Sequence, residues 1–231
     1  MKAIMSWSSG KDSAWALHKI QQEGKYDVLA LLTTLNATHG RVAMHAVRRE
    51  LLQAQARALD LKLWEVDLPW PCSNQEYEQI MSGQITRANQ QGVTHMIFGD
   101  LFLEDIRAYR EQRLFGTGIT PVFPLWKRPT RELALEMIEG GLVAHLTAVD
   151  PAQLDGDFVG RRFDRDLLDA LPAGVDPCGE NGEFHTFVSE APVFRGKVPV
   201  RVRVGEKVQR DGFWFCDLTG ERADGVGKED E

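Results

Sequence analysis

Short apolar runs alternate with stretches of helical spacing along roughly the first hundred residues. A near-continuous apolar run is typical of a buried strand, whereas apolar residues three and four apart indicate an amphipathic helix. These criteria predict strands at Lys2–Ser6, Asp27–Thr34, Lys62–Val66 and Val93–Phe98. They predict helices at Asp12–Gln22, Met44–Asp60 and Ser73–Gln91, the last of which opens with the capping-box pattern Ser73-x-x-Glu76. This alternation predicts an α/β fold, with a parallel sheet and helices on both of its faces.

The pattern changes after about Thr120, where a proline-rich stretch begins. The predicted elements beyond it are a helix at Thr130–Glu139, a strand at Leu142–Val149, a helix at Arg161–Leu171 and a hairpin at Val198–Leu218 that turns at Asp211-Gly212. A long polar loop at 175–186 separates the last helix from the hairpin. We therefore expect two domains, 1–128 and a smaller α+β domain at 129–218, followed by a polar, disordered tail at 219–231.

The composition narrows the choice of function classes. A formal net charge of −7 at pH 7 repels nucleic acid phosphates, which argues against a general role in binding RNA or DNA. The three cysteines, Cys72, Cys178 and Cys216, lie far apart, so neither a disulfide framework nor a compact zinc site is expected. The chain shows no signal peptide and no apolar run of the roughly 20 residues that span a bilayer. We expect a cytoplasmic protein that binds neither nucleic acid nor a membrane.

The sequence SSGKDS lies between the first predicted strand and the first predicted helix. Its residues are Ser8, Ser9, Gly10, Lys11, Asp12 and Ser13. A glycine lets the backbone approach a ligand closely, and the N–H groups at a helix start attract an anion. The serines add hydroxyl donors, Lys11 adds a positive charge, and Asp12 either caps the helix or holds a Mg²⁺ that the phosphates share. We interpret the motif as a phosphate-binding loop; the alternative is an ordinary capped helix with an exposed lysine.

Further polar residues are predicted at the same edge of the sheet. Ligands of such sheets bind beyond the carboxyl ends of the strands, and Gly99-Asp100 follows the fourth predicted strand. Asp100 is a candidate for binding Mg²⁺ or for orienting a substrate carboxylate; alternatively, it caps the next helix. In that helix Arg107 and Arg110 share one face and could clamp a phosphate or a carboxylate, unless the face is simply solvated.

SSGKDS resembles the SGGKDS loop of the PP-loop ATP pyrophosphatases, which are grouped with the adenine nucleotide alpha hydrolases; Ser9 stands where those proteins have glycine. Within that superfamily the chain is similar to the diphthine–ammonia ligase family over roughly residues 3–194. The similarity rests on SSGKDS, GVTHMIFGD (92–100), PVFPLW (121–126) and DPCGENGEFHTFV (176–188). It implies a Rossmann-like sheet of the HUP or PP-loop type.

The resemblance implies an AMP-forming ligase that makes an amide. In this reaction a carboxylate is adenylated, pyrophosphate leaves, and ammonia displaces AMP. The implied cofactors are ATP and Mg²⁺, and the implied partners are ammonium and an acceptor whose carboxylate lies on a protein side chain or on a small molecule. By the same resemblance, Thr33 and Asn36 are candidates for the adenine pocket. A homodimer is one assembly to expect.

The motif GENGEFHT (179–186) places titratable side chains on a glycine-rich loop. Ammonia is mostly ammonium at neutral pH, so its attack on an adenylate needs a proton acceptor, for which Glu183 and His185 are the candidates. Glu180 and Asn181 are candidates for binding the substrate. The alternatives are a metal site or a hydrogen-bonded connecting turn. We expect this loop to face the phosphate loop and to complete an active site whose catalytic residues include Lys11, Asp100, Glu183 and His185.

Other functions fit the same motifs. A PP-loop enzyme of this type could act on a different small carboxylate or on tRNA, although a tRNA-modifying member would carry a CxxC pair or a basic extension, and the sequence has neither. A non-catalytic ATP-binding module of the universal stress type is a further alternative. The titratable loop and the second domain argue against it.

Overall fold

The computed structural model describes residues 1–42, 46–194, 200 and 202–220 of the 231-residue chain. Its strands are β1 (Lys2–Ser6), β2 (Asp27–Asn36), β3 (Arg41–Val42), β4 (Lys62–Leu68), β5 (His95–Ile97), β6 (Thr120–Val122), β7 (Val143–Val149), β8 (Phe184–Glu190), β9 (Val202–Arg210) and β10 (Phe213–Gly220). Its helices are α1 (Lys11–Glu23), α2 (Arg49–Leu59), α3 (Asn74–Gln90), α4 (Glu104–Leu114), α5 (Thr130–Glu139), α6 (Arg165–Ala170) and the 3-10 helix η1 (Gly156–Phe158). No helix within the described residues is long and apolar enough to cross a membrane.

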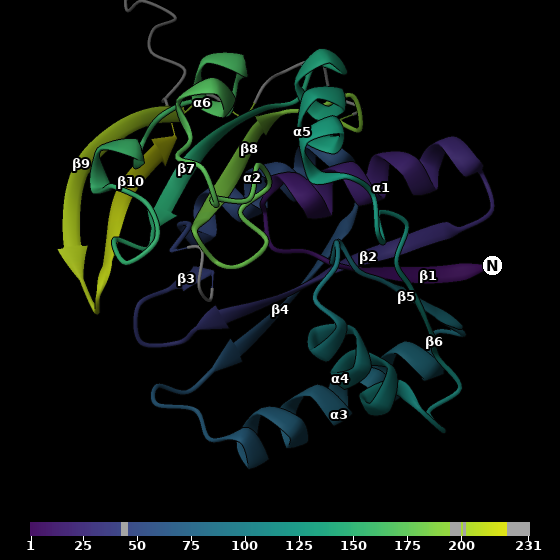
Figure 1. The fold of residues 1–231 in the computed structure, drawn as a ribbon. Coiled ribbons are helices and arrows are strands. Elements are labelled where there is room, and N and C mark those ends of the chain that lie inside the picture. Colours follow the sequence, from purple (N-terminus) through teal and green to yellow (C-terminus); the bar gives the residue numbers. More distant parts are fainter. Residues whose placement is uncertain (43–45, 195–199, 201, 221–231) are drawn as a thin grey trace, which may run out of the picture.

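The first sheet consists mainly of parallel strands (Figure 1). In it β4 pairs with β2, β2 with β1, β1 with β5 and β5 with β6, all in parallel. The short strand β3 adds an antiparallel pairing at the end of β2. Since β2 and β5 lie on opposite sides of β1, the strand order reverses at β1, and its carboxyl end is the expected place for a ligand. The predicted α/β fold is confirmed.

Helices cover both faces of the first sheet (Figure 1). α3 and α4 lie on one face, over a buried cluster that includes Trp64, Met96 and Phe98. α1 and α2 lie on the opposite face, between the first sheet and the elements that follow α5. The capping box predicted at Ser73 is present: its hydroxyl accepts from the N–H of Glu76, and the Glu76 carboxylate accepts from the N–H of Ser73.

The second sheet is antiparallel, with the strand order β8-β7-β10-β9. The hairpin of β9 and β10 turns at the predicted place. Asp211 and Gly212 both have positive φ, 50° and 82°, as a type I′ turn requires. The smaller α+β unit expected after the parallel sheet is therefore built around this sheet, with α5 and α6 beside it (Figure 1).

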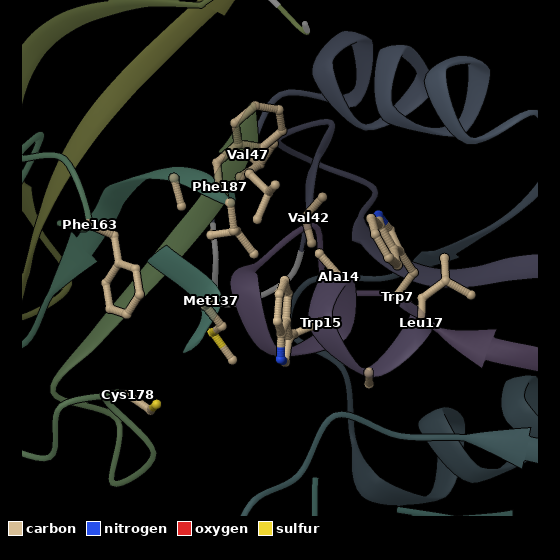
Figure 2. Packing of buried hydrophobic residues seen from close by; sticks show 14 of the residues in the cluster. Trp7, Ala14, Trp15, Leu17, Val42, Val47, Met137, Phe163, Cys178 and Phe187 are labelled. Carbon is tan, nitrogen blue, oxygen red and sulfur yellow. The ribbon is translucent and has the colours of Figure 1, made fainter. Parts of the chain in front are cut away.

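One hydrophobic cluster joins the two sheets. Figure 2 shows Trp7 and Leu17, from the β1–α1 region, in the same buried cluster as Met137, Phe163 and Phe187 from beyond residue 129. Burial of large apolar side chains is the main favourable term in folding, so this cluster binds the second sheet to α1 and α2. The division into domains at 1–128 and 129–218 stays a prediction.

Two predicted helices are shorter than expected. α2 begins at Arg49 rather than at Met44; residues 43–45 lie outside the described part, and Ala46 has a φ of 54°, which a right-handed helix cannot contain. α6 spans only Arg165–Ala170, because Asp164 caps its start and accepts from the N–H of Leu167 at 2.9 Å.

The polar loop and the tail also differ from the prediction. β8 begins at Phe184, so the last three residues of the loop predicted at 175–186 are strand. Thr219 and Gly220, expected in the tail, belong to β10. The remaining residues of the predicted disordered tail, 221–231, lie outside the described residues.

Candidate active site

The phosphate loop joins β1 to α1 at the carboxyl edge of the first sheet. Gly10 precedes the helix and offers no side-chain cap. Thr186 of β8 supplies one instead, because its Oγ1 accepts from the N–H of Lys11 at 3.1 Å. Ser8 Oγ lies 3.2 Å from Ser13 Oγ, which donates to the Gly10 carbonyl at 2.9 Å. The second sheet therefore supplies a hydrogen-bond partner at the start of α1, where we expect an anion to bind.

Ser9 adopts a backbone conformation that favours glycine. Its φ is 70°, in the left-handed region that costs a residue with a Cβ about 1–2 kcal/mol. Its carbonyl oxygen accepts from the N–H of Val188 at 3.0 Å and from Nε2 of Gln55 at 3.0 Å. Within the described residues its buried Oγ has no hydrogen-bond partner. Contacts from distant parts of the chain therefore hold the loop in this conformation.

Lys11 is buried, unlike the exposed lysine expected at a helix start. Only 3% of its side chain is exposed, and Nζ lies 2.9 Å from Oδ2 of Asp12. Nζ also lies over the rings of Phe163 and Phe184, at 5.7 and 5.3 Å from their centroids. Burial alone would lower the pKa of Lys11, but the acidic groups around it, Asp12 foremost, together outweigh burial, and the pKa is raised. Lys11 therefore keeps its positive charge at neutral pH and places this charge within the phosphate loop.

Asp12 is the candidate for holding a metal ion. The described residues contain no group of three or more His, Cys, Asp or Glu that could bind one. Burial raises the pKa of Asp12 against the opposing charge of Lys11. Oδ1 of Asp12 is buried and has no hydrogen-bond partner in the described part of the chain. A single carboxylate oxygen of this kind fits a Mg²⁺ whose other ligands are phosphates and waters.

Gly99 allows the end of β5 to approach α1. A Cβ at Gly99 would lie 2.9 Å from the carbonyl carbon of Asp12 and 2.9 Å from the nitrogen of Ser13. Backbone atoms cannot yield as the end of a flexible side chain can. Any larger residue at position 99 must therefore displace the first turn of α1.

We expect Gly99→Ala to destabilise the protein by about 1–3 kcal/mol, the usual effect of inserting a methyl group into a packed region. Urea denaturation measures this change. Gly83→Ala is the matched control, because Gly83 lies inside α3 and a Cβ there meets nothing within 4 Å. Helix propensity predicts that the control is neutral or more stable by up to about 1 kcal/mol. Equal stability of the two variants would contradict the close approach.

Two adjoining cavities open at this edge. The smaller, of about 240 Å³, lies between the phosphate loop and the GENGEFHT loop. The larger, of about 760 Å³, extends from the ends of β1 and β2 to α3 and α4. Both are lined by Ser6, Ser8, Phe98, Arg110 and His185. The prediction that the GENGEFHT loop faces the phosphate loop is confirmed for Gly179, Glu180, Gly182, Phe184, His185 and Thr186.

Asp100 and Arg110 bind each other at the wall of the smaller cavity. Nε of Arg110 donates to Oδ2 of Asp100 at 2.6 Å, and Nη2 donates to Oδ1 at 3.0 Å. The guanidinium lies 4.4 Å from the ring centroid of Phe98. The residue that precedes α4 is Leu103, so Asp100 is not its cap. The pair fixes the direction of Arg110, and both side chains line the cavity.

Arg107 lies away from the cleft, although the sequence places it on one helix face with Arg110. Its Nε donates to Glu111 at 2.7 Å, and its guanidinium lies over the rings of Phe123 and Trp126, at 4.9 and 4.7 Å. Arg107 lines neither cavity. Its position fits packing at the surface of α4 and not substrate binding.

Of the two candidates for the adenine pocket, only one lines either of the two cavities. Thr33 lines the larger cavity, where its Oγ1 donates to the carbonyl of Trp7 at 2.7 Å. Oδ1 of Asn36 accepts from the backbone N–H groups of Thr38 and His39, at 3.0 and 3.2 Å, in a local turn. Asn36 lines neither cavity, because its side chain serves the turn after β2.

Glu180 is the carboxylate that the GENGEFHT loop presents to the cleft. Its Oε1 accepts from the backbone N–H of Leu101 at 2.7 Å, which ties this loop to the segment after β5. Burial raises the pKa of Glu180 to about 7; the hydrogen bond from Leu101 lowers it, and the charge of Asp12 raises it. A carboxyl group with this pKa exchanges protons near neutral pH.

Glu183, expected to be a catalytic base, has a structural position instead. It is buried, and Oε1 accepts from the N–H of Asp176 at 2.9 Å and from Nδ2 of Asn181 at 3.0 Å. Neither Glu183 nor Asn181 lines either of these two cavities. Of these two carboxylates, Glu180 lines the smaller cavity and Glu183 does not. Glu183 and Asn181 hold the loop together from within.

His185 lines both cavities. Burial and, to a smaller extent, the charge of Lys11 lower its pKa to about 4. The imidazole is therefore neutral at pH 7 and is a weak proton acceptor, better suited to hydrogen bonding than to deprotonating ammonium.

Two residues that contact the phosphate loop are not among the site residues predicted from the sequence. They are Gln55 and Thr186. The sequence carries a signal for Gln55 alone. It lies on the face of α2 that buries Leu51, Leu52 and Leu59, where a polar side chain needs hydrogen-bond partners. Thr186 has no comparable signal, because its contact with Lys11 joins residues 175 apart.

Comparison with known proteins assigns the chain to a family. A family model described as the diphthamide synthase N-terminal domain matches residues 1–116, and one described as the diphthamide synthase C-terminal domain matches residues 129–220. A diphthine–ammonia ligase from Bos taurus is 34% identical over 88 residues, and that from Homo sapiens is 33% identical over 88 residues. In both, the match covers 36% of this chain and only 33% of the relative's length. A diphthine–ammonia ligase from Danio rerio is 25% identical over 219 residues, 86% of each chain. The N-terminal family model alone spans half of the chain, which therefore belongs to the diphthamide synthase family, as its resemblance to the diphthine–ammonia ligases predicts.

Proposed function

We propose that the protein is an ATP-dependent ligase that joins ammonia to a carboxylate and releases AMP and pyrophosphate. The observation that carries the proposal is the smaller cavity, in which the phosphate loop and the Glu180 carboxyl group face the same space. A reaction that cleaves ATP and transfers a proton needs both groups within reach of one substrate.

The two cavities suit the two ends of ATP. The smaller cavity offers the hydroxyl groups of Ser8 and Ser13 and the start of α1 to the phosphates, with the charge of Lys11 behind them. The larger cavity is within the range of about 300–1,000 Å³ that small-molecule sites occupy, and Trp7, Phe98 and Tyr109 are among the residues that line it. Ser8 lines both cavities, so the α-phosphate is expected beside it.

Mg²⁺ fits beside this loop. Asp12 would hold it through Oδ1, which has no hydrogen-bond partner within the described residues. The ion would neutralise charge on the phosphates during transfer. We propose this role for Asp12 and not for Asp100, whose two oxygens are bound by Arg110.

The acceptor is expected next to Arg110, at the boundary of the two cavities. Its carboxylate oxygen attacks the α-phosphorus, the bond to the bridging oxygen breaks, and pyrophosphate leaves. Glu180 then takes one proton from ammonium, the nitrogen attacks the acyl carbon, the bond to AMP breaks, and a second proton leaves the nitrogen for water to give the amide. The relatives' name gives diphthine as their acceptor. For this chain we propose a carboxylate on a protein side chain or on a small molecule, with ammonium as the nitrogen source.

Incubation with ATP, Mg²⁺ and ammonium, followed by chromatography of the nucleotides, tests the proposal. We expect AMP and pyrophosphate, formed only in the presence of an acceptor, and the acceptors to test are a diphthine-bearing protein and a panel of small carboxylates. ADP as the main product would reject the proposal. ATP binding without turnover on any acceptor would favour a non-catalytic ATP-binding module.

A further inference from the structure

Gln55 connects three separate parts of the chain through one buried side chain. It is fully buried, and its Oε1 accepts from Nε1 of Trp7 at 2.9 Å. Its Nε2 donates to the carbonyl of Ser9 at 3.0 Å and to the carbonyl of Val188 at 2.6 Å. Every hydrogen-bonding group of this amide is thus engaged, which leaves no freedom to rotate.

The bond to Ser9 acts on the direction of the phosphate loop. In a trans peptide unit the carbonyl and the following N–H point in opposite directions. The carbonyl of Ser9 points toward Gln55 and the N–H of Val188, so the N–H of Gly10 points the other way. On that side it meets Oγ of Ser8 at a long 3.3 Å, and Ser8 lines both cavities.

Ser9 would not hold this direction alone. Its φ of 70° is one that serine rarely adopts, and a peptide released from its partners would turn to negative φ. That rotation would carry the Gly10 N–H away from the cleft. Two donors oppose it, the Gln55 amide and the Val188 N–H.

We propose that Gln55 is a positioning residue for the phosphate loop: it holds Ser9 in the left-handed conformation, so that the N–H of Gly10 is directed into the ATP site. The inference rests on the proposed binding of ATP phosphates by this loop. The other end of Gln55 binds the buried indole of Trp7, a residue at the edge of the larger cavity, so the same side chain also fixes the chain directly before Ser8.

A double-mutant cycle between Gln55→Leu and Ser9→Gly tests this role. Leucine removes the donor to the Ser9 carbonyl, and we expect ATP affinity, measured by calorimetry on the full chain, to fall about tenfold. Glycine at position 9 adopts positive φ without cost, so Gln55→Leu in the Ser9→Gly background should weaken ATP binding only two- to threefold. A purely structural role for Gln55 would give the same loss of affinity in both backgrounds.

Gln53→Leu is the matched control. Gln53 lies on the same helix, but its Nε2 donates to Glu65 at 2.8 Å, away from the loop, so ATP affinity should not change. If Gln55→Leu does not fold, the cycle is run with Gln55→Glu, which keeps an acceptor for Trp7 and loses the donor to Ser9. If Gln55→Leu lowers ATP affinity equally with serine and with glycine at position 9, the inference about Gln55 is overturned and the proposed function is not. A wild-type protein that binds no ATP overturns the proposed function as well.

Discussion

Replacing Glu180 with glutamine should slow amide formation by about 10²- to 10⁴-fold, the range typical of a lost general base, and should leave ATP affinity nearly unchanged. Glutamine keeps an oxygen that can accept from the N–H of Leu101, so the contact between the loop and the segment after β5 survives. Only the proton acceptor is removed. Exchange of labelled pyrophosphate into ATP, which reports adenylation without ammonia, should persist in the variant.

The pH dependence gives a second measure of the same group. Burial raises the pKa of Glu180 to about 7, so the wild-type rate should rise through neutral pH as the carboxyl group ionises, and this rise should be absent in Glu180→Gln. The same pKa shift lowers the stability of the folded protein as pH rises. The folded state binds the proton more tightly than the unfolded state, so wild-type stability falls as pH rises from 4.5 to 7, and the variant should lose less stability over that interval.

Glu183→Gln is the matched comparison, three residues further along the same loop. Glu183 lines neither cavity and accepts from Asp176 and Asn181, so its substitution should lower stability and leave the pH profile of the rate in place. A Glu183→Gln variant that loses the rise through neutral pH, beside a Glu180→Gln variant that keeps it, would reverse the assignment.

Lys11→Met should destabilise the folded protein by about 3 kcal/mol, the lower end of the effect of removing one partner from a buried ion pair. Methionine fills much of the volume of lysine beside Phe163 and Phe184, so the loss comes mainly from the Asp12 carboxylate that remains. The lower end applies because 26% of the Asp12 side chain is exposed and retains some solvation. Urea denaturation at neutral pH measures the change.

The double variant Lys11→Met/Asp12→Asn should recover most of that stability, because it removes the unpaired charge. Burial raises the pKa of Asp12, and Lys11 is the main group that opposes this shift, so the deficit of Lys11→Met should shrink as pH falls and Asp12 takes up a proton. A deficit that is independent of pH and is not recovered in the double variant would show that the ion pair does not cause it.

The local patterns of the sequence predict most of the first sheet. Near-continuous apolar runs mark β1, β2 and β4, and the serine-to-glutamate spacing marks the start of α3. Short or interrupted segments escape the same criteria. β3 has only two residues, and β8 begins inside a glycine-rich stretch that reads as a loop. Asp164 is a helix-capping residue that the sequence does display, and it marks the true start of α6.

In the candidate site, too, the sequence predicts the local motifs but not the features that depend on distant residues. The SSGKDS loop and the GENGEFHT loop are recognisable because each concentrates glycine and polar residues in a few positions. The direction of individual side chains is not encoded so locally. Glu180 and Glu183 are chemically equivalent in the sequence, and only the N–H groups of Leu101 and Asp176 determine which carboxylate faces the cleft. The burial of Lys11 likewise depends on Phe163 and Phe184, more than 150 residues away.

Thr186 caps α1, and the Val188 N–H donates to the Ser9 carbonyl. The phosphate loop on the first sheet therefore depends on β8 of the second sheet. Gene fusion could not transfer the first sheet with this loop intact, because the bond to the N–H of Lys11 and one of the two bonds to the Ser9 carbonyl come from a strand encoded some 175 residues later. Substitutions in that strand are expected to disturb the phosphate loop as directly as substitutions in the loop itself. The two halves are therefore expected to be inherited together.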